Sequence, residues 1–212
     1  MKFVRNYNHM TDFIRFFIPF YFILFFTVSF VGISYKVAKQ IGKNPDVLPK
    51  DDSAYGLVGF YFKLILSALF IYTMLLLFFP EDIFSAFKIN IPEPDAAKYS
   101  GLAIMILALI WVITAQLQMK NSWRIGIDST TKTDLVTRGL FRFSRNPIFL
   151  GMTMSLFGFF LVLPTVIAFS FLIIGGMLMQ IQIRLEEEYL QKEHGEIYTA
   201  YKKRVKRMLN LY

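Results

Sequence analysis

The chain has 212 residues, of which 55% are hydrophobic, 17% aromatic and only 18% charged. A soluble domain carries about 25% charged residues, so this composition excludes a disordered chain and argues against a free-standing soluble domain. The formal net charge is +8. With so much apolar sequence, an anionic membrane surface is a better partner for this charge than nucleic acid. Cysteine is absent and there are two histidines, so we predict no metal site.

Stretches without charged residues divide the first half of the chain. Residues 16–35 and 99–119 are charge-free, and residues 53–80 contain a single charge, Lys63. A helix needs about 20 apolar residues to cross a membrane. Each of the three stretches therefore predicts one membrane span.

The longest charge-free stretch covers 38 residues, 146–183. It is too long for one span and is interrupted by Pro164, so it predicts a hairpin of two helices, near 147–163 and 165–183. Beyond it, apolar residues recur at helical spacing and predict an amphipathic helix near the membrane, with a kink at His194-Gly195. These residues are Leu190, Ile197, Tyr201, Val205 and Met208.

The predicted fold is therefore all-α: a polytopic membrane protein with about five transmembrane helices, including the C-terminal helical hairpin, and a C-terminal amphipathic helix. We expect a single membrane domain over residues 1–212. Residues 1–119 would hold spans one to three, and residues 120–212 a loop, the hairpin and the C-terminal helix.

Lysine and arginine gather in the loop after span three and in the C-terminal tail, and 13 of the 23 lie from Lys120 onward. Because basic loops stay on the cytoplasmic side, the C-terminus and this loop should be cytoplasmic. The N-terminus would then lie outside, although Lys2, Arg5 and Arg15 are also basic. This conflict makes the first span the one that the rule supports least.

Polar segments flank the hairpin on both sides, at residues 133–151 and 184–190. If the hairpin closes, they meet at one face and form a polar, aromatic-lined pocket at the membrane boundary. Asn146 and Pro147 also suit the N-cap and first turn of a helix. The acids at 186–188 could equally form a solvated helix face. On a helix, Glu187 points about 100° away from Glu186, which favours separate roles.

Two blocks of residues carry a resemblance to a known family. The first consists of Leu135, Val136, Gly139, Phe141, Arg145, Asn146, Pro147, Phe149 and Gly151. The second consists of Glu186, Glu187, Leu190, Gly195, Tyr198, Tyr201, Arg204 and Val205. With the hydrophobic hairpin between them, they resemble the isoprenylcysteine carboxyl methyltransferase and phospholipid methyltransferase family of integral membrane enzymes. The chain departs from the family pattern at Asn146, where the family has His, at Phe141 and Phe149, where it has Tyr, and at His194, where it has an aromatic residue.

The resemblance implies methyl transfer from S-adenosylmethionine to a lipid-linked or lipophilic acceptor at the cytoplasmic face of the membrane. The acceptor would be an isoprenylcysteine-like carboxylate or a phospholipid amine. The implied cofactor contacts are Thr133, Asp134, Leu135, Val136, Phe141, Asn146, Pro147, Ile148, Phe149 and Glu186. Glu187 and Arg184 are implied on the acceptor side as catalytic residues.

Two other functions fit the same sequence. One is a sterol-type membrane reductase, whose NADPH phosphates would suit the basic loop. The other is a non-catalytic lipid-binding membrane protein. A transporter fits less well, because spans one, three, four and five contain no ionisable residue other than tyrosine.

Overall fold

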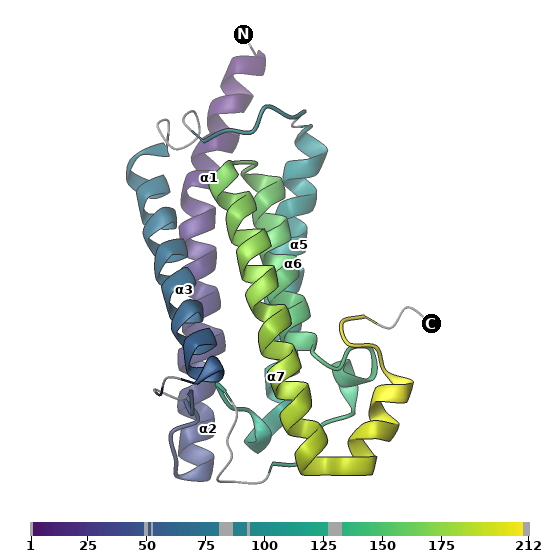
Figure 1. The fold of residues 1–212 in the computed structure, drawn as a ribbon. Coiled ribbons are helices and arrows are strands. Elements are labelled where there is room, and N and C mark those ends of the chain that lie inside the picture. Colours follow the sequence, from purple (N-terminus) through teal and green to yellow (C-terminus); the bar gives the residue numbers. More distant parts are fainter. Residues whose placement is uncertain are drawn as a thin grey trace.

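The fold is a bundle of helices (Figure 1). A computed structural model describes residues 2–48, 51, 53–80, 87–92, 94–126 and 133–209, with side chains from residue 12 onward. The helices are α1 (Lys2–Phe26), a π-helical segment (Thr27–Gly32), α2 (Ile33–Ile41), α3 (Ala54–Phe78), α5 (Asp95–Met119), α6 (Pro147–Val162) and α7 (Val166–Arg204). Within the described residues, β pairing is limited to two isolated bridges. The all-α prediction is confirmed.

In the part of the chain that the structure describes, four helices are long and apolar enough to cross a membrane: Asp12–Ile41, Ala54–Phe78, Asp95–Ser122 and Val166–Arg204. The fifth predicted span, α6, has only 16 residues and so measures about 24 Å, against about 30 Å for the hydrocarbon core. The predicted hairpin is present. Its second arm, α7, continues past the charge-free stretch to Arg204 and is kinked at Gly195, as the helical spacing of the later apolar residues predicted.

The N-terminal span is longer than the sequence predicted. A π-helical segment joins α1 to α2, and the candidate span runs from Asp12 to Ile41 rather than over residues 16–35. Within it, the Arg15 Nε donates a hydrogen bond of 2.7 Å to the Leu77 carbonyl oxygen at the end of α3. A cation at a helix C-terminus is favourable. One of the basic residues that conflicted with the predicted orientation therefore has a structural role.

The two ends of the bundle differ in charge. The N-terminus and the turn between α6 and α7 lie at one end in Figure 1, whereas α2, the segment before α6 and the last turns of α7 lie at the other. At the first end, Phe87–Ile89 binds the hairpin turn through Ile89 N to Pro164 O and Val166 N to Phe87 O, both 2.9 Å. The lysine- and arginine-rich segments therefore share the other end.

Glycines bring α5 and α6 into close contact. A Cβ added at Gly101 would lie 2.7 Å from the Gly158 carbonyl oxygen, and one added at Gly158 would lie 2.7 Å from the Gly101 oxygen. Small residues allow such approach of helices within membranes. The hydrophobic core beside this contact includes Leu76, Met105 and Phe159. This packing fixes the start of α6 and the polar segment before it.

Candidate functional site

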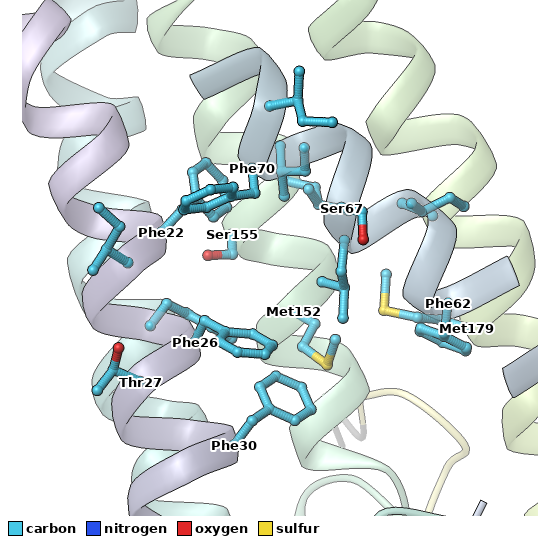
Figure 2. A pocket seen from close by; sticks show the side chains of 18 residues that line it. Phe22, Phe26, Thr27, Phe30, Phe62, Ser67, Phe70, Met152, Ser155 and Met179 are labelled. Atoms are coloured by element: carbon cyan, nitrogen blue, oxygen red, sulfur yellow. The ribbon is translucent and has the colours of Figure 1, made fainter. Parts of the chain in front are cut away.

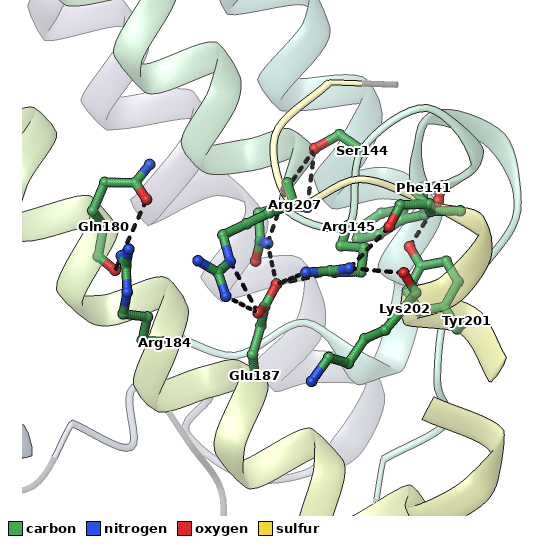
Figure 3. Close-up of polar contacts among 11 residues, drawn as sticks. Phe141, Ser144, Arg145, Gln180, Arg184, Glu187, Tyr201, Lys202 and Arg207 are labelled. Atoms are coloured by element: carbon green, nitrogen blue, oxygen red, sulfur yellow. Dashed lines mark hydrogen bonds and ion pairs between the residues drawn. The ribbon is translucent and has the colours of Figure 1, made fainter. Parts of the chain in front are cut away.

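Glu187 on α7 lies at the centre of a buried ion cluster (Figure 3). Arg145 Nη2 lies 2.8 Å from Glu187 Oε1, and Arg207 Nη2 lies 2.9 Å from Oε2. Asn146 Nδ2 donates to Oε1 at 3.2 Å. Burial by itself would raise the pKa of this carboxyl, but the hydrogen bonds from Arg207 and Arg145 outweigh burial and hold its pKa below the usual range. Glu187 is therefore ionised and fully paired.

The same cluster ties the C-terminal segment across the turn that precedes α6. Arg145 donates from its backbone N to the Lys206 oxygen at 3.0 Å and from Nη1 to the Val205 oxygen at 2.9 Å. Ser144 Oγ and Asn146 Nδ2 both donate to the Arg207 oxygen. Asn146 occupies the N-cap position with Pro147 at the first turn, as predicted, but its side chain makes no cap hydrogen bond. It binds the tail and Glu187 instead.

Beside this cluster lies a cavity of about 400 Å³, here named the site cavity. It draws side chains from both ends of the hairpin and from α1, α3 and α5. Its wall includes two short segments, 45–48 and 123–126, which pair through Val47 N to Ile125 O at 3.0 Å and Ile125 N to Pro45 O at 2.9 Å. Gly126 has φ +100°, and a Cβ there would meet Tyr55 Oη at 2.9 Å. A glycine is required at this position.

Two buried amide oxygens without donors belong to residues of the site-cavity wall. Gln116 and Gln182 are 2% and 5% exposed, and their Oε1 atoms have no hydrogen-bond partner within the described residues. Their Nε2 groups are engaged: Gln116 donates to the Ser29 oxygen at 2.9 Å, and Gln182 donates to Glu186 Oε1 at 2.8 Å. Both residues and Glu186 line the cavity. Because the two amide oxygens are buried and Glu186 is only half-buried, Glu186 is the acceptor among them that a ligand can reach.

The pKa of Glu186 is shifted in the opposite direction to that of Glu187. Glu186 lies after the charge-free part of α7, which ends at Ile183, and outside the membrane span. Burial raises the pKa of Glu186 to about 7, and the hydrogen bond from Gln182 opposes that rise. A bound cation or hydroxyl donor would stabilise the ionised form of such a half-buried carboxyl.

A second cavity, of about 590 Å³, lies between α1, α3, α6 and α7 and is almost wholly apolar. Figure 2 shows its wall of phenylalanine and methionine side chains with Ser67, Thr27 and Ser155 among them. We name it the apolar cavity. Six residues line both cavities: Phe26, Phe30, Phe62, Leu66, Ser67 and Met152. The site cavity, whose lining includes charged side chains, therefore adjoins the apolar cavity.

The structure brings six of the predicted cofactor contacts to the site cavity: Phe141, Asn146, Pro147, Ile148, Phe149 and Glu186. The other four, Thr133, Asp134, Leu135 and Val136, are not among its lining residues. Leu135 packs against Tyr198, Tyr201 and Val205 instead. These ten assignments remain predictions.

The two predicted catalytic residues lie elsewhere. Glu187 is held in the ion cluster and is absent from the cavity lining. Arg184 is exposed, and its Nη1 donates to the oxygen and Oε1 of Gln180 at 2.7 and 3.2 Å, apart from the cluster in Figure 3. Their catalytic roles remain predictions, and the structure supplies no contact between either side chain and the cavity.

Sequence reasoning missed four residues that line the site cavity. Lys63, Gln116, Trp123 and Gln182 line the site cavity but belong to no assigned motif. Of these four, only Lys63 could have been singled out from the sequence, because it is the single charge in an otherwise neutral span. A charge inside a membrane span marks a functional position by default. Gln116 and Gln182 were uncharged residues in charge-free runs. Within the described residues, no group of three His, Asp or Glu side chains could hold a metal ion.

A sequence model of the family described as phospholipid methyltransferase matches residues 97–197. The matched segment contains α5, the loop before α6, α6 itself and α7 up to the kink at Gly195. The match confirms the predicted resemblance, and the matched residues belong to a chain with helices long and apolar enough to cross a membrane. A search of curated proteins finds no match to the chain.

Proposed function

We propose that this chain, whose residues 97–197 match the phospholipid methyltransferase family, transfers a methyl group from S-adenosylmethionine to a lipophilic acceptor at the cytoplasmic face of the membrane. The observation that carries the proposal is the Glu186 carboxyl in the wall of a cavity that adjoins an apolar one. Glu186 can accept from a ligand with donors, and the adjoining cavity suits a lipid chain.

The residues fit the cofactor. S-adenosylmethionine carries an ammonium, an amino group on its base and ribose hydroxyls, and the Glu186 carboxylate can accept from any of these donors. Carboxylates bind such groups through charge-assisted hydrogen bonds, and the aromatic faces of Phe141 and Phe149 favour a cation. When bound, the cofactor supplies an electrophilic methyl group on its sulfonium.

The residues of the chain then serve binding and positioning. Glu186 holds donor groups of the cofactor, and Pro147, Ile148 and Phe149 exclude water from the reacting centre. Methyl transfer is an in-line displacement, so orientation and exclusion of water supply most of the catalysis. Glu187 acts as a positioning residue, because it fixes Arg145 and Asn146 at the edge of the cavity.

The acceptor enters from the membrane side through the apolar cavity. The sterol-type reductase remains a second candidate on fold-level grounds. Its dinucleotide phosphates need donors, and Lys63, Arg124 and Arg145 line the site cavity. The family match at residues 97–197 favours S-adenosylmethionine over NADPH.

Equilibrium titration of the purified protein with S-adenosylmethionine and with NADPH tests the proposal. We expect wild type to bind S-adenosylmethionine and Glu186→Ala to bind it at least about tenfold more weakly, which corresponds to about 1.4 kcal/mol. The matched control is Glu188→Gln, whose exposed carboxylate pairs with Lys192. Equal affinity in wild type and Glu186→Ala would refute the role of Glu186, and binding of NADPH alone would refute the proposal.

A further inference from the structure

Lys63 is the feature that the proposed function leaves unused. It is the only charged residue between Ser53 and Pro80, and it lies in the third turn of α3, within a candidate membrane span. Ionisable residues inside membrane spans are costly and mark ligand or ion pathways by default. The question is therefore which group the ammonium of Lys63 binds.

Lys63 lines the site cavity next to the point where the two cavities join. Its neighbours on the same face of α3, Leu66 and Ser67, lie three and four residues further on and line both cavities. The cavity lining contains two acids, Asp46 and Glu186. Among the described residues, no ion pair joins either to Lys63. Lys63 is thus an exposed residue in the wall of the site cavity, and among the described residues it has no carboxylate partner.

We infer that Lys63 binds the anionic head group of the acceptor and so selects amphiphiles that carry a negative charge. This inference rests on the proposed function, because it assigns the acceptor to the joined cavities. The tail would occupy the apolar cavity among Phe22, Phe62 and Phe70, which Figure 2 shows around its interior. The anion would lie at Lys63, one helical turn from Ser67, with the head group extending into the site cavity.

The geometry accounts for both parts of such a ligand. A volume of about 590 Å³ falls within the range of small-molecule sites, and its wall offers a tail little besides hydrocarbon. A head-group anion placed beside this lysine gains a charge-assisted contact, which a neutral head group cannot make. Carboxylate and phosphate head groups share this chemistry.

Photo-crosslinking of matched amphiphiles tests the inference. The probes are hexadecanoate, hexadecyl phosphate and hexadecanol, each with a diazirine in the tail, added to purified protein in a neutral detergent. We expect the anionic probes to label the walls of the apolar cavity with affinities at least about tenfold higher than hexadecanol. Comparison of the carboxylate with the phosphate probe distinguishes the two sources of negative charge.

The variants assign the selectivity to one residue. Lys63→Gln should remove the preference for anionic probes, and Lys63→Arg should retain most of it, because the charge is kept. Lys39→Gln on α2 is the control for loss of a lysine, since this exposed side chain lines neither cavity. If Lys63 merely extends toward the membrane surface, all three variants will keep the wild-type preference, and the inference fails.

S-adenosylmethionine affinity, measured on the same samples, separates this inference from the proposed function. Retained cofactor binding together with lost head-group selection in Lys63→Gln supports both. Retained cofactor binding with unchanged selection overturns the role of Lys63 alone. Absent cofactor binding in wild type overturns the proposed function, while the head-group preference is still measured. Lys63→Arg keeps the test decisive if Lys63→Gln proves unstable.

Discussion

Two adjacent glutamates on α7 have opposite electrostatic surroundings. Glu187 is 5% exposed and paired with two arginines, so its negative charge is neutralised by groups of the protein itself. Glu186 points about 100° away, lines the site cavity and has a raised pKa. The first therefore holds the site together, and the second is available to a ligand. A carboxylate that is already satisfied is a poor candidate for binding another cation.

The sequence alone predicted that Glu186 and Glu187 take separate roles, because helical geometry fixes the angle between neighbours. It could not predict which of them faces the cavity. That depends on how α7 is rotated about its axis, which is set by packing against α6 and α3. The pairing of Glu187 with Arg207 also joins residues on opposite sides of the kink at Gly195. Nothing in the local sequence predicts that contact.

Replacing Glu187 should destabilise the protein. Glu187→Gln leaves Arg145, which is 9% exposed, without its counter-charge. Loss of one partner from a buried pair costs about 3–5 kcal/mol, and the partial exposure of Arg207 places this case at about 3 kcal/mol. Chemical unfolding in detergent measures the loss. The exposed control Glu188→Gln should change the free energy of unfolding by less than about 1 kcal/mol.

The destabilisation by Glu187→Gln should depend on pH in a defined direction. Its pKa is lowered in the folded protein, so its contribution is complete above the unfolded value of about 4.3 and disappears as the pH falls through the folded value. The difference in stability between wild type and variant should therefore be constant near neutral pH and shrink below about pH 4. A difference that grows on acidification would contradict the ion cluster.

Cofactor affinity should rise with pH because Glu186 must ionise to bind a cation. With a pKa of about 7, the carboxylate fraction increases about tenfold between pH 6 and pH 8. Lys63, Arg124, Arg145 and Asp46 also line this cavity. Titration of wild type against Glu186→Gln at each pH isolates the effect from ionisation of the cofactor itself. A parallel pH dependence in both proteins would show that Glu186 is not the titrating group.

At the scale of elements, Pro164 predicted the hairpin and the spans followed from charge-free runs. The π-helical segment at Thr27–Gly32 was not predictable, since no single residue type specifies a π turn. It is nevertheless close to the site: Phe30 lines both cavities, and the Ser29 carbonyl oxygen accepts from Gln116. Such segments are frequent at functional sites. The long N-terminal helix thus contributes to a site that sequence motifs placed only in the second half of the chain.

Close contact of α5 with α6 should tolerate no side chain at its glycines. In Gly158→Ala the new methyl group would approach the Gly101 oxygen to 2.7 Å, so backbone must move, at a cost of about 1–3 kcal/mol. The matched control is Gly176→Ala on α7, where no atom lies within 4 Å of the added group. We expect the thermal midpoint in detergent to fall for Gly158→Ala and to stay level or rise for Gly176→Ala. Equal midpoints would contradict the close contact.

At the scale of the whole molecule, the site cavity gathers residues that lie far apart in the chain. The pairing of segments 45–48 and 123–126 closes it from one side, and the C-terminal tail is tied beside it through Arg145. Composition and motifs predicted the membrane scaffold and the hairpin end of the site. They could not predict the remaining wall, because contacts between α1, α3 and α5 depend on packing rather than on any local pattern.

The orientation of the bundle is open to a direct test because the chain contains no cysteine. Single substitutions Lys39→Cys and Lys203→Cys lie at the basic end, and Asn90→Cys lies in the segment beside the hairpin turn. By the positive-inside rule, a membrane-impermeant maleimide should label Asn90→Cys in intact cells and the other two only after permeabilisation. The opposite pattern would place the site cavity on the outer face.

The central claim is that the two joined cavities bring a methyl donor to a lipophilic acceptor. The most direct measurement incubates purified protein with S-adenosylmethionine labelled in its methyl group and with total membrane lipid, then follows label into the organic phase. We predict labelled lipid with wild type and with Glu188→Gln, and a loss of at least about tenfold in rate with Glu186→Gln. Absence of label in the lipid with wild type, or equal labelling by Glu186→Gln, would contradict the account.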